Sequence, residues 1–131
     1  IISCDIKQLN MKNKNILGSE LNLCCSNPIT GFYRNGYCET GDKDFGTHTV
    51  CAIVTEEFLK FSLGRGNDLI SERREFNFAG LRPGDKWCLC AIRWKEAYEN
   101  GVAPKILAKS THEKTLDIID KESLIKMSID I

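Results

Sequence analysis

Seven cysteines and two histidines are the residues of this 131-residue chain with the widest range of chemistry. Their side chains can hold a metal ion or act as nucleophile and base, and cysteines can also form disulfides. An odd number of cysteines leaves at least one unpaired if the others form bridges, and no secretory signal is visible. We therefore expect most of them to be buried thiols.

A structural zinc site usually has four such ligands, and their spacing here argues against one. The chain has no Cys-x2-Cys pair. His48 and Cys51 should point to opposite faces of a strand, and Cys88 and Cys90 share a face but lie far from a matching pair. We expect no metal and no other cofactor. Two cysteines of an irregular N-terminal region remain free to converge on an ion with Cys88 or Cys90. They are Cys24 and Cys38.

A thiol enzyme is a second hypothesis, because a cysteine beside a base can act as a nucleophile. Cys38 is the best candidate, since it lies among glycines in a loop where backbone amides could surround an anion. His48 or His112 would be the base. The competing interpretation is that each histidine is a hydrogen-bonded structural residue.

A third hypothesis is a module that binds a small molecule of unknown identity in a pocket built from polar loops. Ligand sites usually form where loops converge over a rigid scaffold. The competing interpretation is that the asparagines and aspartates only stabilise turns and that the arginine pairs with a buried carboxylate. The candidate ligand-binding residues at the ends of expected elements are Asp44, His48, Asn67, Asp68, Arg93 and His112.

A structural or interaction protein is the fourth hypothesis. Exposed aromatic residues could bind a partner or a second copy of the chain, although in a small domain they are more often in the core. A homo-oligomer therefore stays open. The aromatic residues concerned are Phe32, Tyr33, Tyr37, Phe45, Phe76 and Phe78.

Charge and hydropathy exclude two classes of partner. The 18 basic and 18 acidic residues cancel and are scattered, unlike the basic stripe of a nucleic-acid binder. The longest apolar runs, such as residues 50–54, fall far short of the roughly 20 residues that span a bilayer. We expect a cytoplasmic protein with neither nucleic acid nor membrane as partner.

Turn residues fill the segment from Cys24 to Thr47, which predicts a long ordered loop anchored by its aromatic residues. A strand is predicted next, over His48–Val54. Thr55 is a good N-cap for a helix that contains Glu56 and Glu57 in its first turn and ends at Gly64 or Gly66.

The second half of the chain alternates predicted strands and short helices. Pro83 and Gly84 predict a type II turn before a central strand that is apolar on both faces. The predicted elements are a strand Lys86–Arg93, a helix Trp94–Asn100, a strand Pro104–Lys109, a turn capped by Thr111 and a helix Lys121–Met127 capped by Asp120.

These elements predict one α+β domain over residues 15–131, with a small mixed or antiparallel sheet, short helices and a long ordered N-terminal loop. Residues 1–14 are expected to be an N-terminal extension, for which disorder is one alternative.

Six motifs, in order along residues 15–130, resemble those of the bacterial and plant family called domain of unknown function 2237. They are Cys24–Phe32, Cys38–Gly41, Gly46–Ala52, Gly66–Leu69, Pro83–Ala91 with Arg93 and Trp94, and Thr111–Glu113. The resemblance implies a soluble domain and carries over no catalytic residue. A ligand pocket is the favoured function, with the thiol enzyme as the alternative.

Overall fold

The computed structural model describes residues 13–131, so the prediction for residues 1–12 lies outside the described residues. Asn13 and Lys14, which the sequence assigns to the extension, already contact the domain. Lys14 forms an isolated antiparallel bridge with Glu20, and the Asn13 side chain lies 3.0 Å from the His112 ring.

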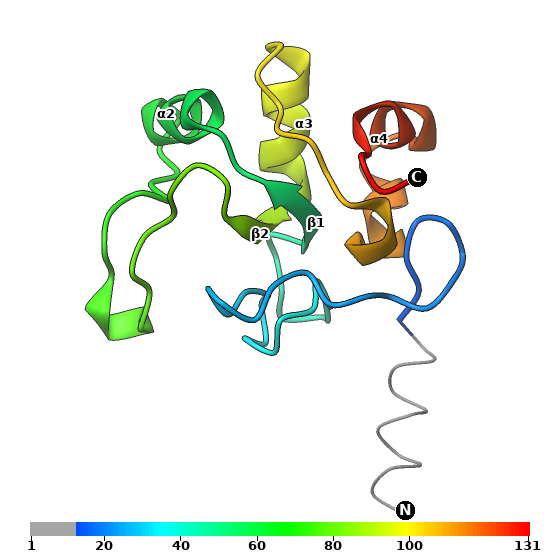
Figure 1. Cartoon of the computed structure of the whole chain (residues 1–131), viewed down its shortest axis with the longest axis horizontal. Helices are drawn as coiled ribbons and strands as arrows, with labels where there is room; N and C mark the ends of the chain where they lie inside the picture. The colour runs from blue at the N-terminus through cyan, green and yellow to red at the C-terminus, as the bar shows by residue number, and fades with distance from the viewer. Residues whose placement is uncertain (1–12) are drawn as a thin grey trace, which may run out of the picture.

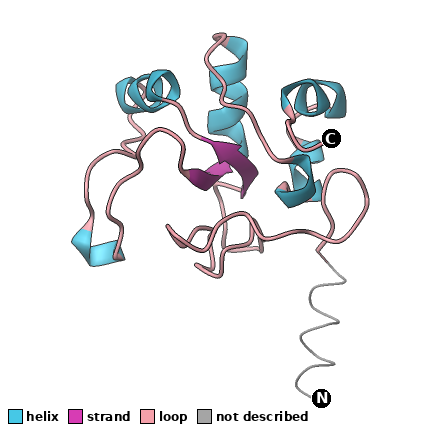
Figure 2. Cartoon of the chain, in the orientation of Figure 1, coloured by secondary structure: helices cyan, strands magenta, loops and turns pink. Residues whose placement is uncertain are grey.

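In the part of the chain described, helices lie on one side of a two-stranded antiparallel sheet and irregular loops on the other (Figure 1). The sheet consists of β1 (His48–Ile53) and β2 (Lys86–Cys90). The α-helices are α2 (Glu56–Gly64), α3 (Ala91–Glu99) and α4 (Lys121–Met127), and the 3-10 turns are η1 (Arg74–Phe76), η2 (Ala108–Ser110) and η3 (Glu113–Asp117). Figure 2 shows how much of the chain is loop. The predicted α+β class is confirmed.

Local signals in the sequence set several boundaries as predicted. The Thr55 hydroxyl accepts a hydrogen bond from the backbone N–H of Phe58 at 3.0 Å and caps α2. The Asp120 carboxylate accepts the N–H of Ser123 and caps α4. Before β2, Gly84 adopts a φ of +96°, which a type II turn requires.

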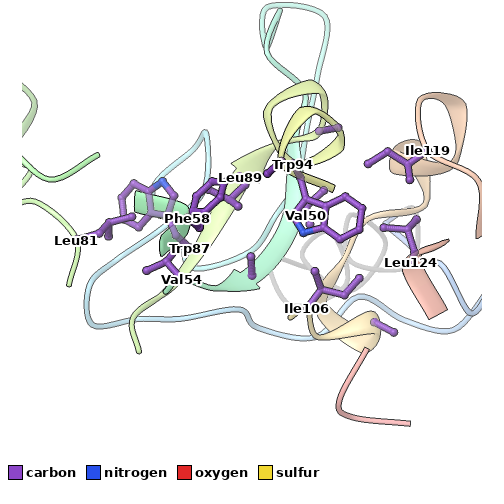
Figure 3. Packing of buried hydrophobic residues seen from close by; sticks show 14 of the residues in the cluster. Val50, Val54, Phe58, Leu81, Trp87, Leu89, Trp94, Ile106, Ile119 and Leu124 are labelled. Carbon is purple, nitrogen blue, oxygen red and sulfur yellow. The ribbon is translucent and has the colours of Figure 1, made fainter. Parts of the chain in front are cut away.

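The helix side of the sheet is held together by apolar packing. Val50 and Leu89 point from the two strands toward Phe58 of α2 and Trp94 of α3 (Figure 3). Trp94 is fully buried, and its indole N–H donates to the carbonyl of Pro104 at 3.0 Å. Burial of a side chain this large dominates the energetics of a small core.

The loop side of the sheet is held together by two disulfides, Cys24–Cys51 and Cys38–Cys88. The expectation that the cysteines are mostly thiols is therefore wrong for the pairs that join the loop to the strands. The Thr30 hydroxyl also accepts the N–H of Cys88 at 2.8 Å, which docks the loop on β2. In the described chain, the thiols of Cys25 and Cys90 are free.

The predicted strand Lys86–Arg93 is too long, and the following helix begins three residues earlier than predicted. The backbone turns at Cys90, and the N–H of Ala91 donates to the carbonyl of Thr47 at 3.0 Å. No Gly or Pro marks this boundary. A tertiary contact sets it instead.

The predicted strand Pro104–Lys109 is reduced to a single position. Ile106 bridges Ala52 of β1. The Asp130 carboxylate accepts the N–H groups of Ala108 and Lys109, which ends the pairing.

The predicted cap at Thr111 is one residue off. The Thr111 hydroxyl donates to the carbonyl of Leu107 and accepts the N–H of Cys51, so it supports β1. The neighbouring His112 ring caps η3 instead, by accepting the N–H of Lys114 at 3.0 Å.

None of the helices in residues 13–131 combines the length and apolar character needed to cross a membrane.

Candidate functional site

The loop side of the sheet contains a cleft of about 490 Å³ between the N-terminal loop, β2 and the excursion of residues 67–78. This volume lies in the usual range for small-molecule sites. Aromatic rings, charged or hydrogen-bonding side chains, and Cys88 of the Cys38–Cys88 disulfide face it. Its lining consists of Gly31, Phe32, Arg34, His48, Asn67, Asp68, Leu69, Arg73, Phe76, Phe78, Trp87 and Cys88.

His48 lines the cleft and is held from behind by a buried carboxylate, Asp44. His48 Nδ1 lies 2.6 Å from Asp44 Oδ1, and Asp44 Oδ2 accepts the backbone N–H of His48 and the hydroxyl of Thr40. The Asp44 side chain is fully buried, whereas 39% of the His48 side chain is exposed. Because a carboxylate holds Nδ1, the neutral ring carries its proton there and presents Nε2 as an acceptor.

A β-bulge turns His48 toward the cleft. The register pairs Val50 with Leu89 but His48 with Cys90, so one extra residue lies in β1 at Thr49. Bulges of this kind redirect a side chain. Strict alternation predicts that His48 and Cys51 face opposite ways, but this prediction is wrong because the bulge places His48 on the face of Cys88 and Cys90.

Asn67 and Asp68 follow α2 and line the same cleft. The backbone of Asn67 is fixed by Ser62, whose hydroxyl donates to the Asn67 carbonyl at 2.8 Å. The side-chain amide of Asn67 makes no hydrogen bond within the described residues. Asp68 accepts hydrogen bonds from Ser71 and Ile70, which lower the pKa of its carboxyl, with a smaller contribution from Arg73. Asn67 is thus open to a ligand, whereas Asp68 is partly used in a turn.

Arginines give the cleft a positive bias. Arg34 lies 5.1 Å above the Trp87 ring, and Arg73 lies 3.7 Å from the Asp68 carboxylate. Arg93 lines an adjoining part of the cleft, of about 180 Å³, which also contains His48 and Asn67. Arg93 also donates to the carbonyl of Arg65 at 3.1 Å.

The predicted site residues therefore divide into two groups. His48, Asn67, Asp68 and Arg93 meet in or beside the cleft, with Asp44 directly beneath His48. His112 does not join them, since it lines a separate depression of about 610 Å³, which Asp44 lines as well.

Both ring nitrogens of His112 are engaged in structure. Nδ1 accepts the N–H of Lys114, and Nε2 lies 3.0 Å from Asn13 Oδ1. Burial lowers the pKa of this imidazole, so it is neutral around pH 7. A histidine with both nitrogens occupied and 5% of its surface exposed is poorly placed to act as a base.

Cys38 is fully buried and bonded to Cys88, so in this structure it offers no thiol for the nucleophile that the sequence predicts. The sulfurs of Cys24, Cys38 and Cys88 lie within 4.8 Å of one another, as the sequence allowed for a metal site. In the structure each of these sulfurs is committed to a disulfide. A disulfide sulfur lacks the negative charge of a thiolate ligand.

Cys90 is the residue that the sequence interpretation missed. Its thiol is free and half-buried, and it lines the smaller part of the cleft with His48 and Arg93. Alternation along β2 indicated a core position, and the strand's early end at Cys90 removed it from the core. No local signal in the sequence marks this boundary, since the predicted strand continues to Arg93.

Of the six aromatic residues considered for an interaction surface, Phe45 and Phe76 are the most exposed, at 91% and 68%. Phe78 instead packs on Trp87, with ring centroids 5.1 Å apart. Phe32, Phe76 and Phe78 line the cleft, whereas Tyr33, Tyr37 and Phe45 do not. A homo-oligomer stays a prediction.

A family model described as an uncharacterized protein conserved in bacteria, DUF2237, matches residues 14–128. The chain belongs to this family. The matched region contains both disulfides and the whole cleft. No curated protein matches the chain.

Proposed function

We propose that this member of the DUF2237 family binds a small planar molecule with a negatively charged group in the cleft. The observation that carries the proposal is that several kinds of binding group converge on one cleft. Aromatic rings, arginines and two open hydrogen-bonding groups, His48 Nε2 and the Asn67 amide, face one space of about 490 Å³. Mostly apolar walls with a few oriented polar groups are typical of ligand sites.

The aromatic walls favour a planar ligand. Trp87 and Phe78 lie on one side, and Phe32 stacks against the His48 ring with centroids 6.3 Å apart and planes 22° apart. Rings of this kind pack well against the faces of another conjugated group.

The charges favour an anion. Arg34 and Arg73 line the larger part of the cleft with one carboxylate, Asp68, and Arg93 lies beside it. Asp68 lies 3.7 Å from Arg73, and Glu96 lies 3.7 Å from Arg93, so these two charges are partly offset. Arg34 has no carboxylate partner among the described residues. A carboxylate or phosphate matches the fork of donors of a guanidinium.

The location of the protein is a separate question. The cytoplasmic location stays a prediction, and the two disulfides are more typical of oxidising compartments. The ligand proposal does not depend on the compartment.

The test is titration calorimetry with a set of small aromatic anions, such as benzoate and phenyl phosphate, beside the neutral analogue benzamide. We expect the anions to bind more tightly than benzamide. The variant Asn67→Ala should weaken binding about tenfold, since one hydrogen bond to a charged ligand is worth roughly 1.5–3 kcal/mol.

Asn22→Ala is the matched control, because Asn22 is an exposed asparagine away from the cleft. Equal affinity of Asn67→Ala and Asn22→Ala would count against the site. Failure of every anion to bind, or tighter binding of benzamide, would overturn the proposal.

A further inference from the structure

Cys90 has the surroundings of a reactive thiol. It is the last residue of β2 and occupies the N-cap position of α3, where its side chain makes no capping hydrogen bond. The first N–H groups of a helix lack acceptors within the helix and favour negative charge. A sulfur anion at this position would therefore be stabilised by α3.

A histidine lies directly opposite Cys90. The register of the sheet pairs His48 with Cys90, and both residues line the smaller part of the cleft. Paired residues of antiparallel strands point to the same face, with Cβ atoms about 4.5–5.5 Å apart. Because Asp44 holds Nδ1, the ring directs Nε2 away from the carboxylate, and within the described residues Nε2 has no partner.

We propose that Cys90 is a nucleophile for acyl transfer, with His48 as its general base and Asp44 as the residue that positions His48. This inference rests on the proposed function, since the acyl compound would be the anionic ligand of the cleft. The substrate class is an ester or thioester with a negatively charged group near the arginines.

The proposed reaction uses Cys90, His48 and one water molecule beside the substrate. The Cys90 thiol is not hydrogen-bonded to His48 Nε2 in the resting structure, so it must first approach this nitrogen. It then gives its proton to Nε2, and the sulfur forms a bond to the carbonyl carbon. The bond from that carbon to the leaving group breaks, and the leaving alcohol or thiol takes the proton from His48. Water then gives a proton to His48 Nε2, and its oxygen forms a bond to the carbonyl carbon. The bond from that carbon to the Cys90 sulfur breaks, the acid is released, and His48 returns the proton to the sulfur.

Gly46 supports this arrangement. A Cβ at residue 46 would lie 2.6 Å from Cε1 of His48, so any other side chain there would displace the ring. The ring cannot move freely, because Asp44 holds it. Gly46→Ala therefore perturbs the base without removing any reacting group.

The test combines an acyl donor with peptide mapping. Protein without reductant is mixed with p-nitrophenyl acetate, release of nitrophenol is followed, and the acetylated cysteine is located by mass spectrometry. We expect a burst of nitrophenol and an acetyl group on Cys90. His48→Gln should slow the burst about 100-fold or more, in line with the loss of a general base.

Asp44→Asn should slow the burst less and shift its pH profile, whereas a purely structural role would leave the profile unchanged. Gly46→Ala should also slow it. Cys25→Ser is the matched control, since Cys25 is the other free and half-buried thiol of the described chain. It should leave the burst unchanged.

Acetylation of Cys25 rather than Cys90, or equal burst rates in wild type and His48→Gln, would overturn the inference. Its failure is distinct from failure of the proposed function. Binding of the aromatic anions by a protein with an unreactive Cys90 overturns only the inference, and a reactive Cys90 without anion binding overturns only the anion site.

Discussion

The two faces of the sheet are stabilised in different ways. The helix face is a packed apolar core around Trp94, with α2, α3 and α4 above it. The loop face has few regular elements and is held by the disulfides Cys24–Cys51 and Cys38–Cys88. The cleft with His48 Nε2 and the Asn67 amide lies on the loop face. Covalent links thus allow loops to present functional groups without a large core of their own.

The largest effect is expected on the helix face. Trp94→Ala removes a fully buried indole and leaves a cavity, which should lower the free energy of unfolding by about 3–5 kcal/mol. Urea denaturation of the variant and of the wild type measures this loss. The difference between the two proteins should be the same in the presence and in the absence of reductant. A loss below about 1 kcal/mol would contradict this description of the core.

The next effect belongs to the loop face. Replacing Cys38 and Cys88 together by alanine opens a loop of 50 residues and should cost roughly 2–4 kcal/mol. The difference from wild type should disappear in reductant, because the wild-type bridge is then also open. Cys25→Ser should be neutral in both conditions. An unchanged unfolding free energy of the double variant without reductant would show that this bridge does not stabilise the loop.

The smallest effect concerns the second histidine. Burial lowers the pKa of His112 below its ordinary value of 6.5, so the unfolded chain binds more protons below that pH. This contribution to stability is complete above pH 6.5 and is lost as the pH falls. Urea denaturation from pH 7 to pH 5 should show a smaller decline in His112→Asn, which keeps an acceptor for Lys114 but does not titrate. Parallel declines of the unfolding free energy in the wild type and in His112→Asn would mean that His112 titrates alike in the folded and the unfolded state.

The parts of the fold that depend on local chemistry could be predicted from the sequence. Thr55 and Asp120 are good caps with apolar helices behind them, and both cap as expected. Thr111 is an equally good cap by type. Its hydroxyl instead donates to the nearby carbonyl of Leu107 and accepts the N–H of Cys51, a contact from a distant part of the chain that no local pattern contains.

The site was predictable in its residue types but not in its grouping. His48 begins a predicted strand, and Asn67 and Asp68 follow a predicted helix. The three residues converge on the cleft. The bulge at Thr49 and the turn at Cys90 together decide which face His48 and Cys90 share, and both come from tertiary hydrogen bonds. Disulfide pairing is a similar case, because spacing in the sequence does not determine which sulfurs meet.

The most direct test of this contrast between the two faces is one peptide map of the folded protein after brief alkylation without reductant. The account predicts linked peptides for Cys24 with Cys51 and for Cys38 with Cys88, and faster alkylation of Cys90 than of Cys25. Free thiols at the four bridged positions, or alkylation of Cys25 ahead of Cys90, would contradict it.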